Sequence, residues 1–152
     1  MMSSTDRIEK TILLRAPRAR VWRALTDHRE FGAWFRVELE GPFREGAPVR
    51  GRITHPGYEH VTLEMQIVRV DAERLFSYRW HPYAVVPGVD YDAEPTTLVE
   101  FRLEEAPGGT RLTIVESGFD ALPAGRRAEA FRMNEGGWAE QLQNVARHVG
   151  SA

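Results

Sequence analysis

Hydrophobic side chains in the last third of the chain recur at a helical period. The positions concerned follow one another at steps of 4, 3, 4, 3 and 4: Phe131, Glu135, Trp138, Leu142, Val145 and Val149. This spacing is typical of one face of a helix. It predicts a helix over about residues 123–148, roughly 39 Å long at about 1.5 Å per residue. An apolar face of this length needs a second layer to cover it.

Alternating apolar and polar positions predict that this second layer is a β-sheet. The strand-like runs are 8–14, 37–40, 49–54, 60–70, 75–81, 96–104 and 111–117. Alternation places three sets of side chains each on one face of its strand: Phe76, Tyr78 and Trp80; Thr97, Val99, Phe101 and Leu103; Leu112, Ile114 and Glu116. Turn residues 107–109 join the last two runs as a hairpin.

Two short helices are predicted after the first strand. Pro17 suits a first helical turn, and Val21, Trp22 and Leu25 follow it on one face. Asp27 is suited to N-cap a second helix, which carries Phe31, Trp34 and Phe35. The order of strand, two helices, about six strands and a long helix predicts an α+β fold with a meandering antiparallel sheet. A helix held in a curved sheet tends to enclose a pocket.

Composition and charge limit the classes of partner. A chain of 152 residues with a net charge of −2 is expected to form one domain over 1–152, with its core at about 8–148, and gives no reason to expect nucleic acid. Cysteine is absent, which excludes disulfides and thiolate chemistry. No apolar stretch reaches the ~18 residues of a membrane span, and residues 1–10 are too polar for a secretory signal. We therefore expect a cytoplasmic protein without membrane insertion.

Several motifs resemble those of a known family. Residues 16–27 (APRARVWRALTD) and 31–35 (FGAWF) resemble the opening of the helix-grip superfamily, also called START-like, Bet v 1-like or SRPBCC. Residues 116–119 (ESGF) and 137–142 (GWAEQL) are similar to those of its activator of heat-shock-protein-90 ATPase homologues. The resemblance implies a curved antiparallel sheet of about seven strands around the C-terminal helix, with a hydrophobic cavity between them. It does not imply chaperone activation, because the eukaryotic activator uses an additional N-terminal domain for which this length leaves no room.

Glu116 is the first candidate for chemistry, since alternation directs it towards the long helix. A buried carboxylate must be paired or hydrated. It is expected either to act as a general acid or base, or to hold a ligand, or to fasten the strand to the helix through Asn134 or Gln141. His81, at the end of a strand, is either its acid–base partner or a surface residue with a hydrogen bond of its own.

A ligand-binding cavity is predicted from the aromatic and polar side chains expected to face inwards. Its candidate residues are Trp34, Phe35, Met65, Tyr78, Trp80, His81, Phe101, Glu116, Phe131, Asn134, Trp138 and Gln141. Such aromatic side chains either fill a core or wall a pocket. Gly136 and Gly137 are expected to permit a close approach or a bend near Trp138. Residues 82–95, with three prolines, are interpreted as a lid or as a surface loop.

Motifs for cofactors and metals are missing from the sequence. His55 and His60 do not have a metal-ligand spacing, so no metal site is expected. Ser117 is not in a nucleophile elbow, and no glycine-rich phosphate loop occurs, so no cofactor is expected either.

The favoured hypothesis is a protein without enzymatic activity that binds a small apolar or aromatic molecule. One alternative is a partner-binding, co-chaperone-like module with a vestigial cavity, which predicts a filled core and an exposed apolar patch. Another is an enzyme of the cyclase or dehydratase kind that uses Glu116 and His81. An exposed sheet edge allows a homodimer.

Overall fold

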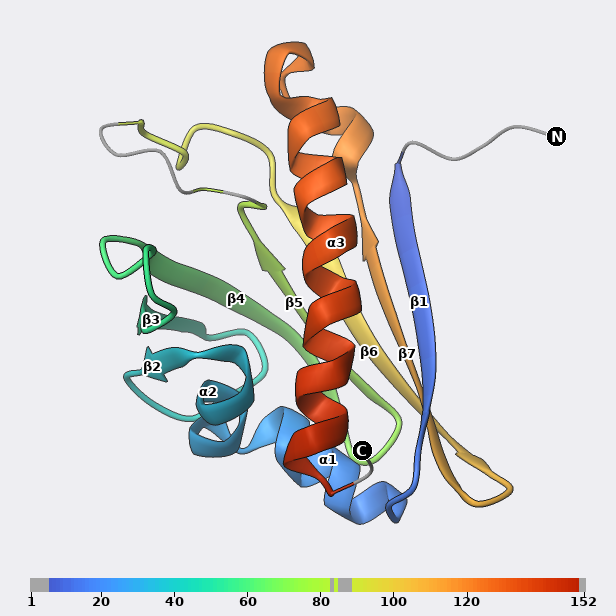
Figure 1. Cartoon of the computed structure of the whole chain (residues 1–152). Coiled ribbons are helices and arrows are strands. Elements are labelled where there is room, and N and C mark those ends of the chain that lie inside the picture. The colour runs from blue at the N-terminus through green and yellow to red at the C-terminus, as the bar shows by residue number, and fades with distance from the viewer. Residues whose placement is uncertain (1–5, 83, 85–88, 151–152) are drawn as a thin grey trace, which may run out of the picture.

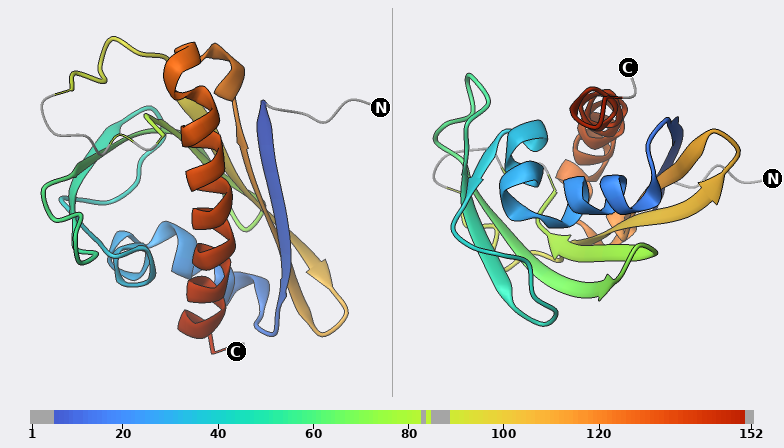
Figure 2. Two further views of the ribbon diagram at one scale, coloured as in Figure 1. Left: turned by 45° about the horizontal axis from the view of Figure 1, so that its top comes forward. Right: turned by 90° about the horizontal axis from the view of Figure 1, so that it is seen from below.

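The protein is a curved seven-stranded antiparallel sheet with a long helix against its concave side, as Figures 1 and 2 show. The computed structural model describes residues 6–82, 84 and 89–150. The strand order is β1-β7-β6-β5-β4-β3-β2. The strands are β1 (Arg7–Leu14), β2 (Val37–Leu39), β3 (Pro48–Ile53), β4 (Thr62–Asp71), β5 (Leu75–Trp80), β6 (Thr97–Ala106) and β7 (Gly109–Ser117). The α+β helix-grip fold expected from the sequence is confirmed.

Two short helices close one end of the sheet (Figure 2). Helix α1 (Arg18–Thr26) begins after Pro17, and α2 (His28–Phe35) begins after Asp27. The side chain of Asp27 accepts hydrogen bonds from the backbone N–H groups of Arg29 and Glu30, at 2.9 and 3.2 Å. These bonds satisfy donors at the helix start that have no partner within the helix, which is why the chain turns there. The predicted N-cap is confirmed.

Helix α3 (Ala124–His148) runs the length of the molecule, with Pro123 as its N-cap. Trp138, Leu142 and Val145 are buried as the helical period predicted. Glu135 does not belong to that face, because it is exposed and the half-buried Asn134 points inwards instead. A Cβ atom at Gly136 or Gly137 would meet nothing within 4 Å, so the expected close backbone approach there is wrong. No helix among the described residues is long and apolar enough to cross a membrane.

Strand pairing in the centre of the sheet brings Glu116 towards the helix. Strands β6 and β7 form a hairpin in which Ala106 pairs with Gly109 and Val99 pairs with Glu116. Leu112, Ile114 and Glu116 are all completely buried, as the alternation predicted. The face of β7 that packs below α3 therefore ends in a carboxyl group.

The space between α2, β5, β6 and α3 is filled mainly by aromatic rings. Phe31 packs edge to face on Trp34 at 4.7 Å between ring centroids, and Phe76 stacks on Phe101 at 5.9 Å. Trp138 lies edge to face on Phe101 at 5.8 Å. Close-packed rings at these separations leave no room for a ligand in this part of the sheet.

Candidate functional site

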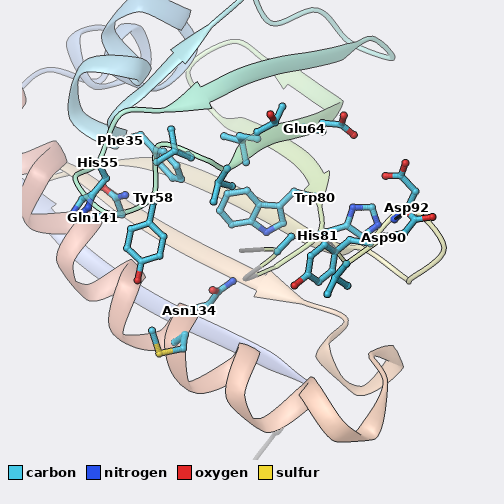
Figure 3. Close-up of a pocket in the computed structure, with 18 residues that line it drawn as sticks. Phe35, His55, Tyr58, Glu64, Trp80, His81, Asp90, Asp92, Asn134 and Gln141 are labelled. Carbon is cyan, nitrogen blue, oxygen red and sulfur yellow. Dashed lines mark hydrogen bonds between the residues drawn. The ribbon is translucent and has the colours of Figure 1, made fainter. Parts of the chain in front are cut away.

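A pocket of about 480 Å³ remains where the sheet opens away from the aromatic core. It lies between the β3–β4 connection, the end of β5, the segment that follows β5, and α3 (Figure 3). Its lining consists of Phe35, Ile53, His55, Tyr58, Val61, Thr62, Leu63, Glu64, Trp80, His81, Ala84, Val89, Asp90, Tyr91, Asp92, Met133, Asn134 and Gln141. Segments far apart in the sequence thus contribute to one site.

Apolar side chains at this pocket are unusually exposed. The five large hydrophobic residues exposed in the described chain include Tyr58, Val89 and Met133, which all line the pocket and are 38%, 38% and 40% exposed. Phe35 and Trp80 form the inner wall, with their rings 5.9 Å apart. An exposed apolar rim around a hollow is a feature of ligand-binding sites.

The charged groups of the lining are acidic. Asp90 and Asp92 lie with His81 at one end of the pocket, and neither aspartate takes part in an ion pair within the described chain (Figure 3). Glu64 also lines the pocket, and its carboxylate is 3.4 Å from the Nε atom of Arg50. Among the described lining residues there is no arginine or lysine. The aspartates therefore bring negative charge to this end of the pocket, and no arginine or lysine of the described lining balances it.

Behind the inner wall lies Glu116, which is completely buried and receives four hydrogen bonds. Trp80 Nε1 and Thr97 Oγ1 donate to its Oε2 atom at 2.7 and 2.5 Å. Trp138 Nε1 and Asn134 Nδ2 donate to its Oε1 atom at 2.8 and 2.9 Å. A carboxylate has about four acceptor positions, so these donors occupy its capacity. The group is satisfied without a cation.

The donors to Glu116 come from three different elements, which the carboxyl group joins together. Trp80 ends β5, Thr97 begins β6, and both Asn134 and Trp138 lie on α3. Buried indole N–H groups need an acceptor, because an unpaired one loses its hydration without replacement. The sequence-based alternative in which Glu116 fastens the strand to the helix through Asn134 is confirmed. Gln141 does not take part, since its side chain bonds to Asn144 instead.

Tyr78 lies beside this network on β5 and is also completely buried. Its hydroxyl group has no hydrogen-bond partner among the described residues. Burial, together with the nearby charge of Glu116, raises the pKa of the Tyr78 phenol well above its ordinary value of 10.0. Tyr78 is therefore a neutral side chain with an unsatisfied polar atom in the core.

His81 does not meet Glu116. Its Nε2 atom is 3.1 Å from the carbonyl oxygen of Glu94, and no hydrogen bond joins His81 to Glu116 in the structure. Glu94 in turn forms an ion pair with Arg126, whose guanidinium lies 4.9 Å from the centre of the Tyr91 ring. These contacts attach the end of the 82–95 segment to the start of α3. Residues 83 and 85–88 of the predicted lid lie outside the described residues.

The structure divides the twelve predicted cavity residues into two groups. Five line the pocket: Phe35, Trp80, His81, Asn134 and Gln141. Seven lie outside its lining: Trp34, Met65, Tyr78, Phe101, Glu116, Phe131 and Trp138. Six of these seven are buried in the core or its polar network, and Phe131 packs edge to face on Phe119 at 5.2 Å between ring centroids. They pack on one another because the rings are large enough to fill the space that the sheet encloses.

Other lining residues were not identified from the sequence, notably His55, Tyr58 and the acidic pair Asp90 and Asp92. All four lie in connections between strands, where neither strand nor helix periodicity assigns a direction to a side chain. The length of the 82–95 connection was the available signal for two of them. No such signal in the sequence indicates that Tyr58 lines a pocket.

One protein-family model matches most of the sequence. The model of the activator of Hsp90 ATPase homolog 1-like proteins matches residues 15–150. The chain belongs to this family. Comparison of the sequence with curated proteins gives no match.

Solved structures share the fold of this family member at low sequence identity. DynU16, a protein of the dynemicin biosynthetic locus, matches with a TM-score of 0.72 and 24% identity over 95% of this chain and 47% of its own. The chain thus spans about half the length of DynU16. A protein of Mesorhizobium loti matches with a TM-score of 0.74 and 19% identity over 94% of this chain and 96% of its own. CalU16 of Micromonospora echinospora matches with a TM-score of 0.63 and 23% identity over 95% of this chain and 74% of its own.

Proposed function

We propose that this protein binds a small apolar or aromatic molecule in the pocket and has no catalytic role. The pocket itself is the observation that carries the proposal. Its volume of about 480 Å³ lies within the range of about 300–1,000 Å³ that is usual for small-molecule sites. Three exposed apolar side chains line it, and a bound apolar molecule would remove them from water.

The burial of Glu116 away from the pocket argues against an enzyme that would use Glu116 and His81 as its acid and base. A general acid or base has to come within hydrogen-bond reach of a substrate atom. The oxygens of Glu116 are taken up by four protein donors, and the residue does not line the pocket. Its hydrogen bonds support a role in holding the pocket wall.

A partner-binding module with a vestigial cavity predicts a filled core and an exposed apolar patch in place of a pocket. Here Tyr58, Val89 and Met133 gather around a hollow, which supports a small ligand better than a flat partner surface. The cytoplasmic location stays a prediction. So does the homodimer, which an open sheet edge allows.

A binding screen tests this function. The purified protein is titrated with fatty acids, flavonoids, polyketides, sterols and aromatic acids while the melting temperature and tryptophan fluorescence are recorded. A ligand at about 100 times its Kd adds about 2.7 kcal/mol to the free energy of unfolding, which raises the melting temperature by roughly 5–10 °C. Because Trp80 lines the pocket, the same ligand should change the fluorescence.

A matched pair of variants assigns any binding to the pocket. Met133→Gln makes an apolar position of the lining polar, whereas Val68→Gln does the same on β4 outside the lining, where Val68 is 39% exposed. We expect Met133→Gln to raise Kd about five- to tenfold, because about 1 kcal/mol of apolar contact is lost, and Val68→Gln to leave it unchanged. A folded protein that responds to no compound, or equal effects of the two substitutions, would contradict the proposal.

A further inference from the structure

Two side-chain amides on α3, those of Asn134 and Gln141, line the pocket. They are seven residues apart, so they lie on one helix face about 10 Å from each other along the axis. Figure 3 shows Gln141 near the His55 end of the pocket and Asn134 closer to Trp80. An amide can present either its oxygen, an acceptor, or its nitrogen, a donor. Which one faces the ligand depends on the partner behind each amide.

Asn134 presents its oxygen. Its Nδ2 atom donates to Oε1 of Glu116 at 2.9 Å. Glu116 also accepts hydrogen bonds from two indole N–H groups, which can only donate. An Asn134 turned the other way would place two acceptors against each other. The buried network therefore leaves the amide oxygen of Asn134 as the acceptor available on this side of the pocket.

Gln141 presents its amide nitrogen to the pocket, because a chain of hydrogen bonds that starts at Arg147 engages its oxygen. Arg147 has no acceptor atom and donates to Oδ1 of Asn144. That bond fixes the amide of Asn144, whose Nδ2 atom then donates to Oε1 of Gln141 at 3.0 Å. The carbonyl oxygen of Gln141 is thus engaged. Its amide nitrogen, which has no partner within the described chain, is the donor that remains for a ligand.

Gly137 lies between the two amides on the same helix face, three residues after Asn134 and four before Gln141. A Cβ atom at this position would meet nothing within 4 Å. Glycine inside a helix is unfavourable by about 1 kcal/mol relative to alanine, and no packing contact accounts for it here. The missing side chain leaves the helix surface between the amides bare.

Charge at the pocket adds a second restriction on the ligand. Asp90 and Asp92 lie at the end of the pocket opposite Gln141, and the described lining has no arginine or lysine (Figure 3). A carboxylate ligand would lose part of its hydration there and would lie beside two carboxylates of the same charge. Acids are therefore disfavoured, whereas a hydroxyl group or an amine would find acceptors at this end.

We propose that the pocket selects an elongated apolar molecule without a carboxylate, with a hydrogen-bond donor for Asn134 and an acceptor for Gln141. The donor is a hydroxyl group or an amine, and the acceptor is a carbonyl or an ether oxygen. This inference rests on the proposed binding function. It adds that buried or outer side chains decide which lining amide accepts and which donates. Glu116 orients Asn134, and Arg147 orients Gln141 through Asn144.

Matched biphenyl derivatives test the polarity by titration calorimetry. The parent compound has a hydroxyl group on one end and an acetyl group on the other. One analogue carries methoxy in place of hydroxyl, a second carries ethyl in place of acetyl, and a third carries a carboxylate in place of acetyl. Loss of one hydrogen bond should raise Kd about 3- to 10-fold for each of the first two analogues. The carboxylate should bind more weakly than either.

Asn144→Asp tests the relay without changing a lining residue. An aspartate at 144 offers only acceptors, so Gln141 must turn its nitrogen towards it and its oxygen towards the pocket. The preference for acetyl over ethyl should then disappear. Gln143→Glu adds the same charge one residue away on an exposed position and should keep the preference.

The outcomes separate the two proposals. Equal binding of all four compounds, or an acetyl preference that Asn144→Asp leaves unchanged, overturns the inferred polarity while the binding function stands. Failure of all four compounds to bind a folded protein that does bind a compound of the screen also overturns the inferred polarity alone. Failure of folded protein to bind any compound of the screen or of this series contradicts the binding function, and the inferred polarity with it.

Discussion

Trp80 and Trp138 stack with ring centroids 5.7 Å apart and an angle of 26°, and their indole N–H groups donate to opposite oxygens of Glu116. Trp80 also forms part of the inner wall of the pocket. One buried carboxyl group thus joins a strand of the sheet, the long helix and the binding site. Stability and the shape of the pocket are coupled through it.

Glu116→Gln is expected to destabilise the protein although the side chains have nearly the same shape. Glutamine replaces one acceptor oxygen with a donor, so one indole N–H, which can only donate, loses its partner and faces an N–H group, while the Thr97 hydroxyl or the Asn134 amide has to turn to accept. An unsatisfied buried donor costs about 1–3 kcal/mol, so we expect a loss of this size in the free energy of unfolding. Urea unfolding monitored by tryptophan fluorescence measures this loss.

Glu105→Gln is the control, because Glu105 is an exposed glutamate on β6. Its effect should remain within about 0.5 kcal/mol, as for most surface substitutions. If Glu116→Gln is as mild as this control, the hydrogen-bond network does not contribute to stability.

Tyr78→Phe is expected to stabilise the protein. The substitution removes a completely buried hydroxyl group that has no partner in the described chain and leaves the ring packing in place. The expected gain is about 1 kcal/mol, or a rise of roughly 2–4 °C in melting temperature. Tyr58→Phe serves as the exposed comparison and should have little effect. A lower melting temperature for Tyr78→Phe would mean that the hydroxyl group has a partner.

Because the phenol of Tyr78 is buried, we also expect the free energy of unfolding to fall at alkaline pH. Burial, and then the charge of Glu116, raises the pKa of this phenol, so the folded state favours its neutral form. Unfolded tyrosine ionises near pH 10.0, which means that the unfolded state gains stability as the pH rises above that value. The free energy of unfolding should therefore fall above about pH 10 in the wild type, and less steeply in Tyr78→Phe.

Glu30 connects α1, α2 and the end of α3. Arg20, Arg23 and His148 lie 2.7, 2.8 and 2.9 Å from its carboxylate. Burial alone would raise the pKa of Glu30, but the hydrogen bonds from His148 and the two arginines, with the charge of Arg20, lower it overall.

Acid should therefore weaken the contact between these three helices. Because the folded pKa of Glu30 lies below its ordinary value of 4.5, its contribution is complete above pH 4.5 and is lost as the pH falls through the folded pKa. Glu30→Gln should lower stability at neutral pH and flatten the acid side of the profile, as measured by urea unfolding from pH 7 to pH 3. Equal slopes for wild type and variant below pH 4.5 would contradict this assignment.

Gly136→Ala should stabilise α3, because a Cβ atom at this exposed position meets nothing within 4 Å. The expected gain is about 1 kcal/mol from helix propensity. Gly32→Ala in α2 should do the opposite, since its Cβ atom would lie 2.3 Å from the carbonyl oxygen of Val37. Thermal unfolding of both variants compares the two helices. A destabilising Gly136→Ala would indicate a role for this glycine beyond the helix itself.

The elements of the fold were predictable from the sequence because each follows a local rule. The seven strands follow the period of two, and the long helix follows the period of 3.6. Asp27 identified the start of α2, and residues 107–109 identified the last hairpin. Glu135 was assigned to the wrong face because spacing alone cannot tell it from Asn134, one position away and on the edge of the same helix face.

By itself the sequence determined the α+β fold with an antiparallel sheet and the inward direction of Glu116, because periodicity and strand alternation are properties of neighbouring residues. The helix-grip family followed from motifs, those at 16–27, 31–35, 116–119 and 137–142. Tertiary structure decided which aromatic rings fill the core and which border a pocket, since that depends on how side chains from β5, β6, α2 and α3 share one volume. It also decided the partners of Glu116 and the exclusion of His81 from them. Trp80, Thr97 and Trp138 are far apart in the chain, and only the register of the sheet against α3 brings their donors to the two oxygens of one carboxyl group.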